Sequence, residues 1–249
     1  FGIPWAFGIN CLSYAALIGA LLIIHPRQQA ARPKERPKLR DSFDIIRQAP
    51  QLAVLLGVVA SVSFALDPVT TLAPAFATQV FHHSDTLAGY LIGAFGTGAV
   101  IAAVFATGRS ETPYRRIFSM LALLAVGIAT YAFLSPLVLA FIALGVAGFG
   151  YLAGQTRATT LLQLGVEDHQ RGRVMALWSV CFLGTRPIAS LIDGSLASLV
   201  GVHLTALLMT LPVFAAATGM LILYRRQARA ARSEAVEGSV LGGSPASHD

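Results

Sequence analysis

The sequence predicts an all-α fold, a multi-pass transmembrane helix bundle of seven spans, on the basis of three observations. The 249 residues are 55% hydrophobic and only 12% charged, with a mean hydropathy of +0.67, whereas a typical soluble domain has roughly 25% charged residues. Seven apolar stretches are long enough to cross a bilayer, which takes about 20 helical residues. Basic residues are concentrated in alternate connections between these stretches.

Each expected helix follows from a long run of apolar residues, and the seven runs are 5–24, 52–81, 86–107, 117–134, 137–162, 174–200 and 204–224. The first run lies close to Phe1, which is not an initiator Met, and no signal-peptide pattern precedes it. We therefore expect the sequence to begin partway through a larger protein. The second run follows a basic linker and contains Asp67 beside Pro68.

Glycines distinguish the third and fifth runs. Four-residue spacings such as Gly89 to Gly93 and Gly150 to Gly154 place glycines on one helix face, which predicts close approach of helix backbones. The fourth and seventh runs are bounded by arginines, and the sixth follows a short charged loop. Short connections make successive helices antiparallel neighbours.

Charge placement predicts the orientation. Most of the 18 Lys and Arg residues lie within residues 25–50, 109–116, 171–173 and 225–232, and the intervening connections contain none. Positive residues collect on the cytoplasmic side of a membrane. We therefore expect the first residue outside and the C-terminus in the cytoplasm, so that the net charge of +6 reports topology and needs no nucleic-acid partner.

Composition also divides the chain. Residues 25–50 are rich in Pro and basic side chains and are expected to form a cytoplasmic linker, in which Ser42 could cap a short amphipathic helix carrying Phe43 and Ile46. Residues 51–224 are expected to form a six-helix transmembrane bundle. Residues 225–249 are basic and then rich in Gly, Ser and Ala, and are expected to be a disordered cytoplasmic tail.

One loop and the helix after it are specific enough to indicate a family. The stretch "VEDHQRGRVMALWSVCFLG" resembles the loop before the penultimate helix in permeases of the major facilitator superfamily, and "TLLQL" before it resembles the branch that contains the enterobactin exporter and the macrolide-efflux permeases. The loop motif consists of Glu167, Asp168, Arg171, Gly172 and Arg173. Its arginines are expected to anchor topology and could form a charge relay with the two acids.

This resemblance implies what the chain does. It implies a secondary active transporter that works by alternating access, with proton antiport driving efflux of an amphipathic small molecule, either a drug-like compound or a siderophore. It places the protein in the bacterial inner membrane, in contact with the lipid bilayer. Residues 1–24 would be the last helix of the N-terminal half, and the rest of that half would be missing from this sequence.

Ionisable residues inside the expected spans are the candidate site. A charge at a helix centre costs roughly 2.5–3.5 kcal/mol on the insertion scale, so such residues normally face a partner or a water-filled cavity. The candidates for substrate binding or proton coupling are Asp67, Arg157, Arg186 and Asp193, together with the polar Gln155. We expect an ion pair between Asp67 and Arg186. Arg157 could snorkel to the cytoplasmic side or hold an inner gate.

Two structural alternatives stand beside this interpretation. Asp67 followed by Pro68 has the form of a helix N-cap, so Asp67 could instead restart a broken helix. Arg186 and Asp193 are seven residues apart on one helix face and could form a structural ion pair.

Other functional classes fit the sequence less well. A seven-helix membrane receptor or sensor would share the expected topology, but a retinal protein needs a lysine in its last helix, and both lysines lie in the linker. The sequence contains no metalloprotease, nucleophile-elbow or phosphate-loop pattern at a membrane boundary, so we expect no enzyme. No cofactor is expected. His82 and His83 have no further ligands nearby, and we expect no metal site.

Overall fold

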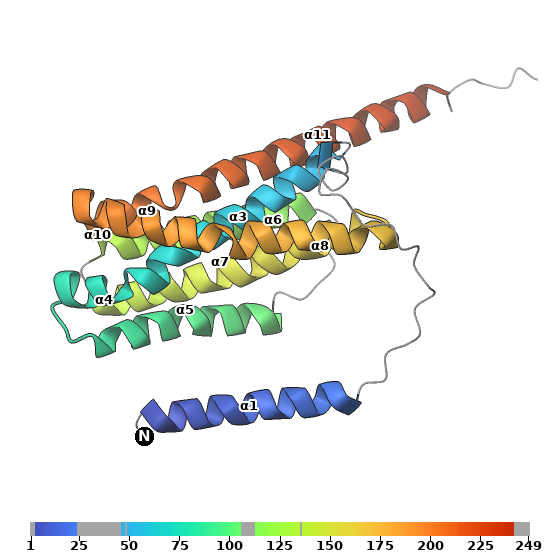
Figure 1. Ribbon diagram of the computed structural model, residues 1–249. Helices are drawn as coiled ribbons and strands as arrows, with labels where there is room; N and C mark the ends of the chain where they lie inside the picture. Colours follow the sequence, from blue (N-terminus) through green and yellow to red (C-terminus); the bar gives the residue numbers. More distant parts are fainter. Residues whose placement is uncertain (1–2, 24–45, 48, 106–112, 135, 242–249) are drawn as a thin grey trace, which may run out of the picture. The chain divides into compact units, whose positions relative to one another are not determined.

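The computed structural model describes residues 3–23, 46–47, 49–105, 113–134 and 136–241 (Figure 1). These residues form helices joined by short connections, and no strand occurs among them, which confirms the all-α prediction. The chain divides into two compact units, residues 1–38 and 39–249. The first unit contains α1 (Ile3–Ile23), which matches the first expected run. The short helix predicted after Ser42 lies almost wholly outside the described residues.

The second unit is a helical bundle. Its elements are α3 (Pro50–Thr71), α4 (Ala73–Ala75), the π-helical η1 (Phe76–Val80), α5 (Thr86–Phe105), α6 (Pro113–Phe133), α7 (Leu137–Leu164), α8 (Asp168–Leu183), α9 (Thr185–Val200), α10 (Val202–Leu208) and α11 (Leu211–Leu241). Six segments of the described chain are long and apolar enough to cross a membrane, with α8 and α9 forming one and α10 with the start of α11 another. This agrees with the expected multi-pass bundle.

Helix α7 lies against both α5 and α6, and α3 lies against α7, α8, α9 and α11 (Figure 1). The core face of α3 carries Val58, Val59, Val62 and Ala65, none of which has any exposed surface. Because α3 is apolar almost all round, it can be covered on several sides at once. This central position is what brings Asp67 on α3 close to α9.

The expected second helix is broken near its end. Helix α3 runs through Asp67 and Pro68 and ends at Thr71, after which Leu72 separates it from α4. Pro74 explains the break, because its ring occupies the space of the Thr70 carbonyl one turn earlier and it has no N–H to bond that oxygen. The proposal that Asp67 is the N-cap of a restarted helix is therefore wrong, since Asp67 lies inside α3.

A proline also interrupts the sixth expected helix. Pro187 has no N–H for the carbonyl of Leu183, and the helix is interrupted at Gly184 between α8 and α9. The Thr185 hydroxyl donates to the Cys181 carbonyl at 2.7 Å in the same turn. Helix α9 ends where Gly201 adopts a φ of 83°, a left-handed conformation that glycine tolerates.

The end of the chain corrects the predicted tail. Helix α11 continues to Leu241, so the expectation of disorder is wrong for residues 225–241, and residues 242–249 lie outside the described part. The sequence after Tyr224 is rich in Ala, Arg and Glu, which have high helix propensity, and contains no proline before Leu241. In Figure 1 the start of α3, the start of α8 and the extended part of α11 lie at one end of the bundle, with α4 and α10 at the other.

Candidate functional site

Asp67 is the only acid of the central helix α3. Its side chain is 2% exposed, and each of its carboxylate oxygens accepts a hydrogen bond from a hydroxyl group. Ser190 on α9 donates to Oδ1 at 3.0 Å, and Thr71, one turn further along α3, donates to Oδ2 at 3.2 Å. Asp67 is therefore held by neutral donors from two helices.

Asp193 lies near Asp67 on the neighbouring helix. Its side chain is 0% exposed, and both of its carboxylate oxygens are buried with no hydrogen-bond partner among the described residues. Ser190 and Asp193 are three residues apart on α9 and hence on one helix face. Asp193 therefore lies one turn along α9 from the Ser190 hydroxyl that bonds Asp67.

Arg186 does not fill the role expected of it. No ion pair within the described chain joins Arg186 to Asp67 or to Asp193. Arg186 belongs to the first turn of α9, whereas Ser190 and Asp193 lie one and two turns further along. The predicted Asp67–Arg186 pair is replaced by the Asp67–Ser190 hydrogen bond.

Two further candidates lie on α7. Gln155 is 7% exposed, and neither its amide nitrogen nor its amide oxygen has a hydrogen-bond partner in the described structure. Arg157 is partly exposed, and its Nη1 donates to the Ala153 carbonyl at 3.4 Å. Gln155 is therefore a buried polar group that could bind a ligand or water, while the roles predicted for Arg157 stay predictions.

The loop motif forms part of a helix start. Helix α8 begins at Asp168, whose carboxylate pairs with Arg171 at 2.9 Å. Arg171 also donates through Nε to the Gln163 carbonyl at 3.0 Å, in the last turn of α7, where carbonyls lack helical partners. Glu167 instead lies 3.1 Å from His169. Gly172 is exposed and Arg173 partly so. The motif thus joins α7 to α8.

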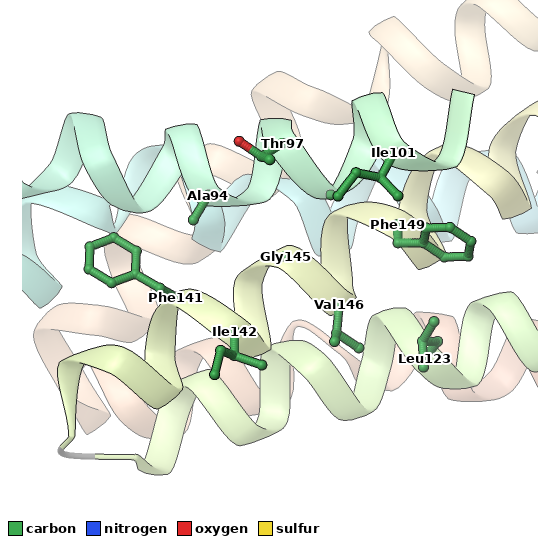
Figure 2. Close-up of a pocket in the computed structure, with 10 residues that line it drawn as sticks. Ala94, Thr97, Ile101, Leu123, Phe141, Ile142, Gly145, Val146 and Phe149 are labelled. Carbon is green, nitrogen blue, oxygen red and sulfur yellow. The ribbon is translucent and has the colours of Figure 1, made fainter. Parts of the chain in front are cut away.

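An apolar pocket of about 520 Å³ lies elsewhere in the bundle, among α5, α6 and α7. Figure 2 shows Phe141 and Phe149 on α7 on either side of Gly145, with Ala94, Thr97 and Ile101 on α5 across from them. The Thr97 hydroxyl donates to the Gly93 carbonyl at 2.8 Å, so it has no free hydrogen to offer a ligand. The pocket contains none of the residues predicted for the site.

Sequence reasoning missed Ser190 and Thr71 as the partners of Asp67. The signal for Ser190 was weak but present, because the run "TRPIASLIDG" is polar for a membrane span. Thr71 lies four residues after Asp67, which is one helical turn. Nothing in the sequence says which face of α9 meets α3, so the Ser190 contact required the fold.

Comparison with known sequences identifies relatives of this chain. The family model described as Major Facilitator Superfamily matches residues 1–182 and, in a second match, residues 55–247. The multidrug efflux pump Tap of Mycolicibacterium fortuitum is 27% identical over 133 residues, covering 53% of this chain and 32% of that protein. The Tap protein of Mycobacterium tuberculosis (strain ATCC 25618 / H37Rv) is 25% identical over 217 residues, covering 84% and 50%. This chain thus spans at most half the length of these curated relatives.

A solved structure shares the fold. It is a bacterial homologue of the human lysosomal transporter Spinster, in an inward-facing and unoccupied conformation. The TM-score is 0.54 at 14% sequence identity, and the match covers 84% of this chain and 56% of the other. At this identity the likeness concerns the arrangement of helices alone.

Proposed function

Because the chain belongs to the Major Facilitator Superfamily, we propose that it is part of a secondary active transporter in a bacterial inner membrane. The transporter exports an amphipathic small molecule, a drug-like compound or a siderophore, by alternating access, and proton antiport drives the export. The names of the Tap efflux pumps support the direction of transport. Family membership does not favour the seven-helix receptor that the sequence had left open.

The division of the chain into domains is part of this proposal. Helix α1 is the last helix of an N-terminal half, residues 25–50 are the linker, and the bundle from α3 to α11 is the C-terminal half. The separation of residues 1–38 from the rest supports this division. The arginines near the starts of α6 and α8 and in the extension of α11 support a cytoplasmic C-terminus.

The observation that carries proton coupling is the environment of Asp67. This carboxylate is buried within a membrane-spanning helix and is held by Ser190 and Thr71 rather than by a basic side chain. A carboxylate tied to hydroxyls can gain or lose a proton without breaking an ion pair, and intramembrane acids commonly mark proton pathways. Asp67 is therefore the proposed coupling residue.

The apolar pocket supports an amphipathic substrate. Its volume falls within the roughly 300–1,000 Å³ usual for ligand sites, which are lined mainly by apolar and aromatic side chains. The pocket would take the apolar part of the substrate, since its lining offers no charged group. The polar part would then be recognised elsewhere.

The coupling proposal is tested by Asp67→Asn in the full-length protein. Inverted membrane vesicles are loaded with a pH-sensitive dye, and proton efflux is followed when a fluorescent lipophilic cation is added as substrate. We expect the variant to insert normally and to lose proton-coupled flux, whereas Asp85→Asn, an exposed acid in the connection before α5, keeps it. Unchanged proton-coupled flux in Asp67→Asn would contradict the proposal.

A further inference from the structure

We infer that Asp67, Ser190 and Asp193 form one binding site that holds a single hard monovalent cation, either a proton or Na⁺, between α3 and α9. Asp193 and Ser190 thereby join Asp67 in the site. The functional meaning of this inference rests on the proposed transport function, but the binding itself can be measured without transport.

The first step concerns charge. Two buried carboxylates lie on neighbouring helices, with Asp67 2% and Asp193 0% exposed, and Ser190, which bonds Asp67, lies one turn before Asp193 on α9. Buried carboxylates at close range repel each other and lose their hydration, so a cation must compensate for at least one of them. No Lys, Arg or His within the described chain forms an ion pair with either acid.

The second step concerns Asp193, whose two oxygens are buried without a hydrogen-bond partner in the described chain. Buried polar atoms are almost always satisfied, and an exception requires a ligand, water or ion. Asp67 already has one hydroxyl donor on each oxygen. The open positions in the cluster are therefore those of Asp193.

The third step excludes the neighbouring groups as the compensating charge. Helix α9 lies against α3, α8 and α10. Asp67 is the only titratable residue of α3, α10 offers only His203, and α8 offers Cys181 and the charged residues of its first turns. His203 bonds through Nδ1 to the Ala132 carbonyl of α6, and Arg186 on α9 itself forms no ion pair with either acid in the described chain. None of these groups neutralises the two acids.

The ligand class follows from the atoms. The cluster consists of carboxylate and hydroxyl oxygens, which are the donors that hard cations prefer. Ser190 is neutral and donates to Asp67 at 3.0 Å, so it leaves the charge of the two acids unchanged. One bound monovalent cation would reduce the combined charge of Asp67 and Asp193 from two negative charges to one. A proton bound to Asp193 could be shared as a hydrogen bond within the cluster, and Na⁺ could be bound by the same oxygens.

The test uses the purified full-length protein and its Asp67→Asn, Asp193→Asn and Asp85→Asn variants. The melting temperature is measured as NaCl replaces choline chloride at constant ionic strength, because a ligand that binds only the folded state raises it. In parallel, infrared difference spectra between acidic and alkaline buffer report the C=O stretch of a protonated carboxyl group. Ser190→Ala is a milder variant if Asp67→Asn does not fold.

Each outcome decides the inference. A Na⁺-dependent rise in the melting temperature that is lost in both site variants and kept in Asp85→Asn identifies Na⁺. No Na⁺ effect, with a carboxylic acid band lost in both site variants, identifies the proton. Absence of both responses, or either response kept in Asp193→Asn, overturns the inference. If proton-coupled flux survives in Asp67→Asn, the proposed coupling role of Asp67 fails. The melting-temperature and infrared results can still be interpreted, because they measure binding without transport.

Discussion

Gly98 of α5 lies directly against the backbone of Gly145 of α7, so that a Cβ atom added to Gly98 would overlap the Gly145 carbonyl oxygen. The backbone of Phe95 faces Gly148 in the same way one turn away. Backbones come this close only where a side chain is missing. The crossing of α5 and α7 therefore depends on glycine at positions 98 and 148, and Gly98 and Gly145 also line the apolar pocket.

Gly98→Val should disrupt this crossing. Forcing extra carbons into a packed contact costs about 1–3 kcal/mol or prevents folding, so we expect a clear fall in the melting temperature of the purified protein. Gly96→Val, two residues earlier on the same helix, is the matched control, because nothing lies within 4 Å of its added Cβ. Equal melting temperatures for the two variants would contradict the observed crossing.

Ser190→Ala should raise the proton affinity of Asp67 while leaving the fold intact. The change removes the hydroxyl that donates to Asp67 Oδ1, and because a hydrogen bond to a carboxylate favours its charged form, losing the bond favours the protonated form. The dependence of export on proton concentration measures this effect. Ser179→Ala, on an exposed face of α8, should leave that dependence unchanged. A Ser190→Ala profile like that of the parent protein would argue against the role of this bond.

Pro187→Ala should straighten the helix between α8 and α9. The alanine supplies the N–H that the Leu183 carbonyl lacks, so the melting temperature should stay the same or rise. Export should nevertheless fall, because straightening moves Ser190 and Asp193 away from Asp67. Export rates and melting temperatures of Pro187→Ala and of Ile188→Ala, an exposed neighbour, check this. Full export in Pro187→Ala would show that export does not require the interruption between α8 and α9.

Thr159→Val should loosen α8 from α7. The Thr159 hydroxyl accepts a hydrogen bond from Trp178 Nε1 at 3.0 Å, and valine has the same shape without the acceptor. We expect a loss of about 0.5–1.5 kcal/mol of stability and a shift in Trp178 fluorescence, measured with Trp5 replaced by Phe. Thr156→Val, which is exposed on α7, should show neither change.

Gly145→Leu should fill the apolar pocket. A Cβ at Gly145 would meet only the Ala94 carbonyl oxygen, at 3.8 Å, which is an ordinary contact. We therefore expect little loss of stability but a several-fold fall in export of a lipophilic cation. Gly89→Leu, which has open space around it, is the control. Normal export by Gly145→Leu would remove the pocket from the substrate pathway.

Much of the fold follows from the sequence because membrane helices are specified by local composition. A segment within the bilayer must satisfy its own backbone hydrogen bonds, so apolar length alone indicates a helix. This is why the expected runs match the helices from α5 to α7 closely. The helix breaks at Leu72 and Gly184 are caused by nearby prolines, and the length of an apolar run alone does not predict them.

The glycine pattern shows where local reasoning stops. Four-residue spacing pointed to Gly150, and close approach there is confirmed, because an added Cβ would lie 2.6 Å from the Met120 carbonyl oxygen. It also pointed to Gly89 and Gly93, but both have open space around them, while Gly98 makes the close contact with α7. Spacing shows that glycines share a face, but it does not show which face meets another helix. Crossing positions are decided by how two whole helices fit together.

The sequence by itself determined that this chain is a bundle of membrane helices with acids inside its spans, because hydropathy and charge are properties of each segment alone. The tertiary structure decided what those acids meet. Asp67 and Ser190 are 123 residues apart, and their contact depends on the face that α9 turns toward α3. Partner choice between distant segments is set by packing, which no single segment encodes.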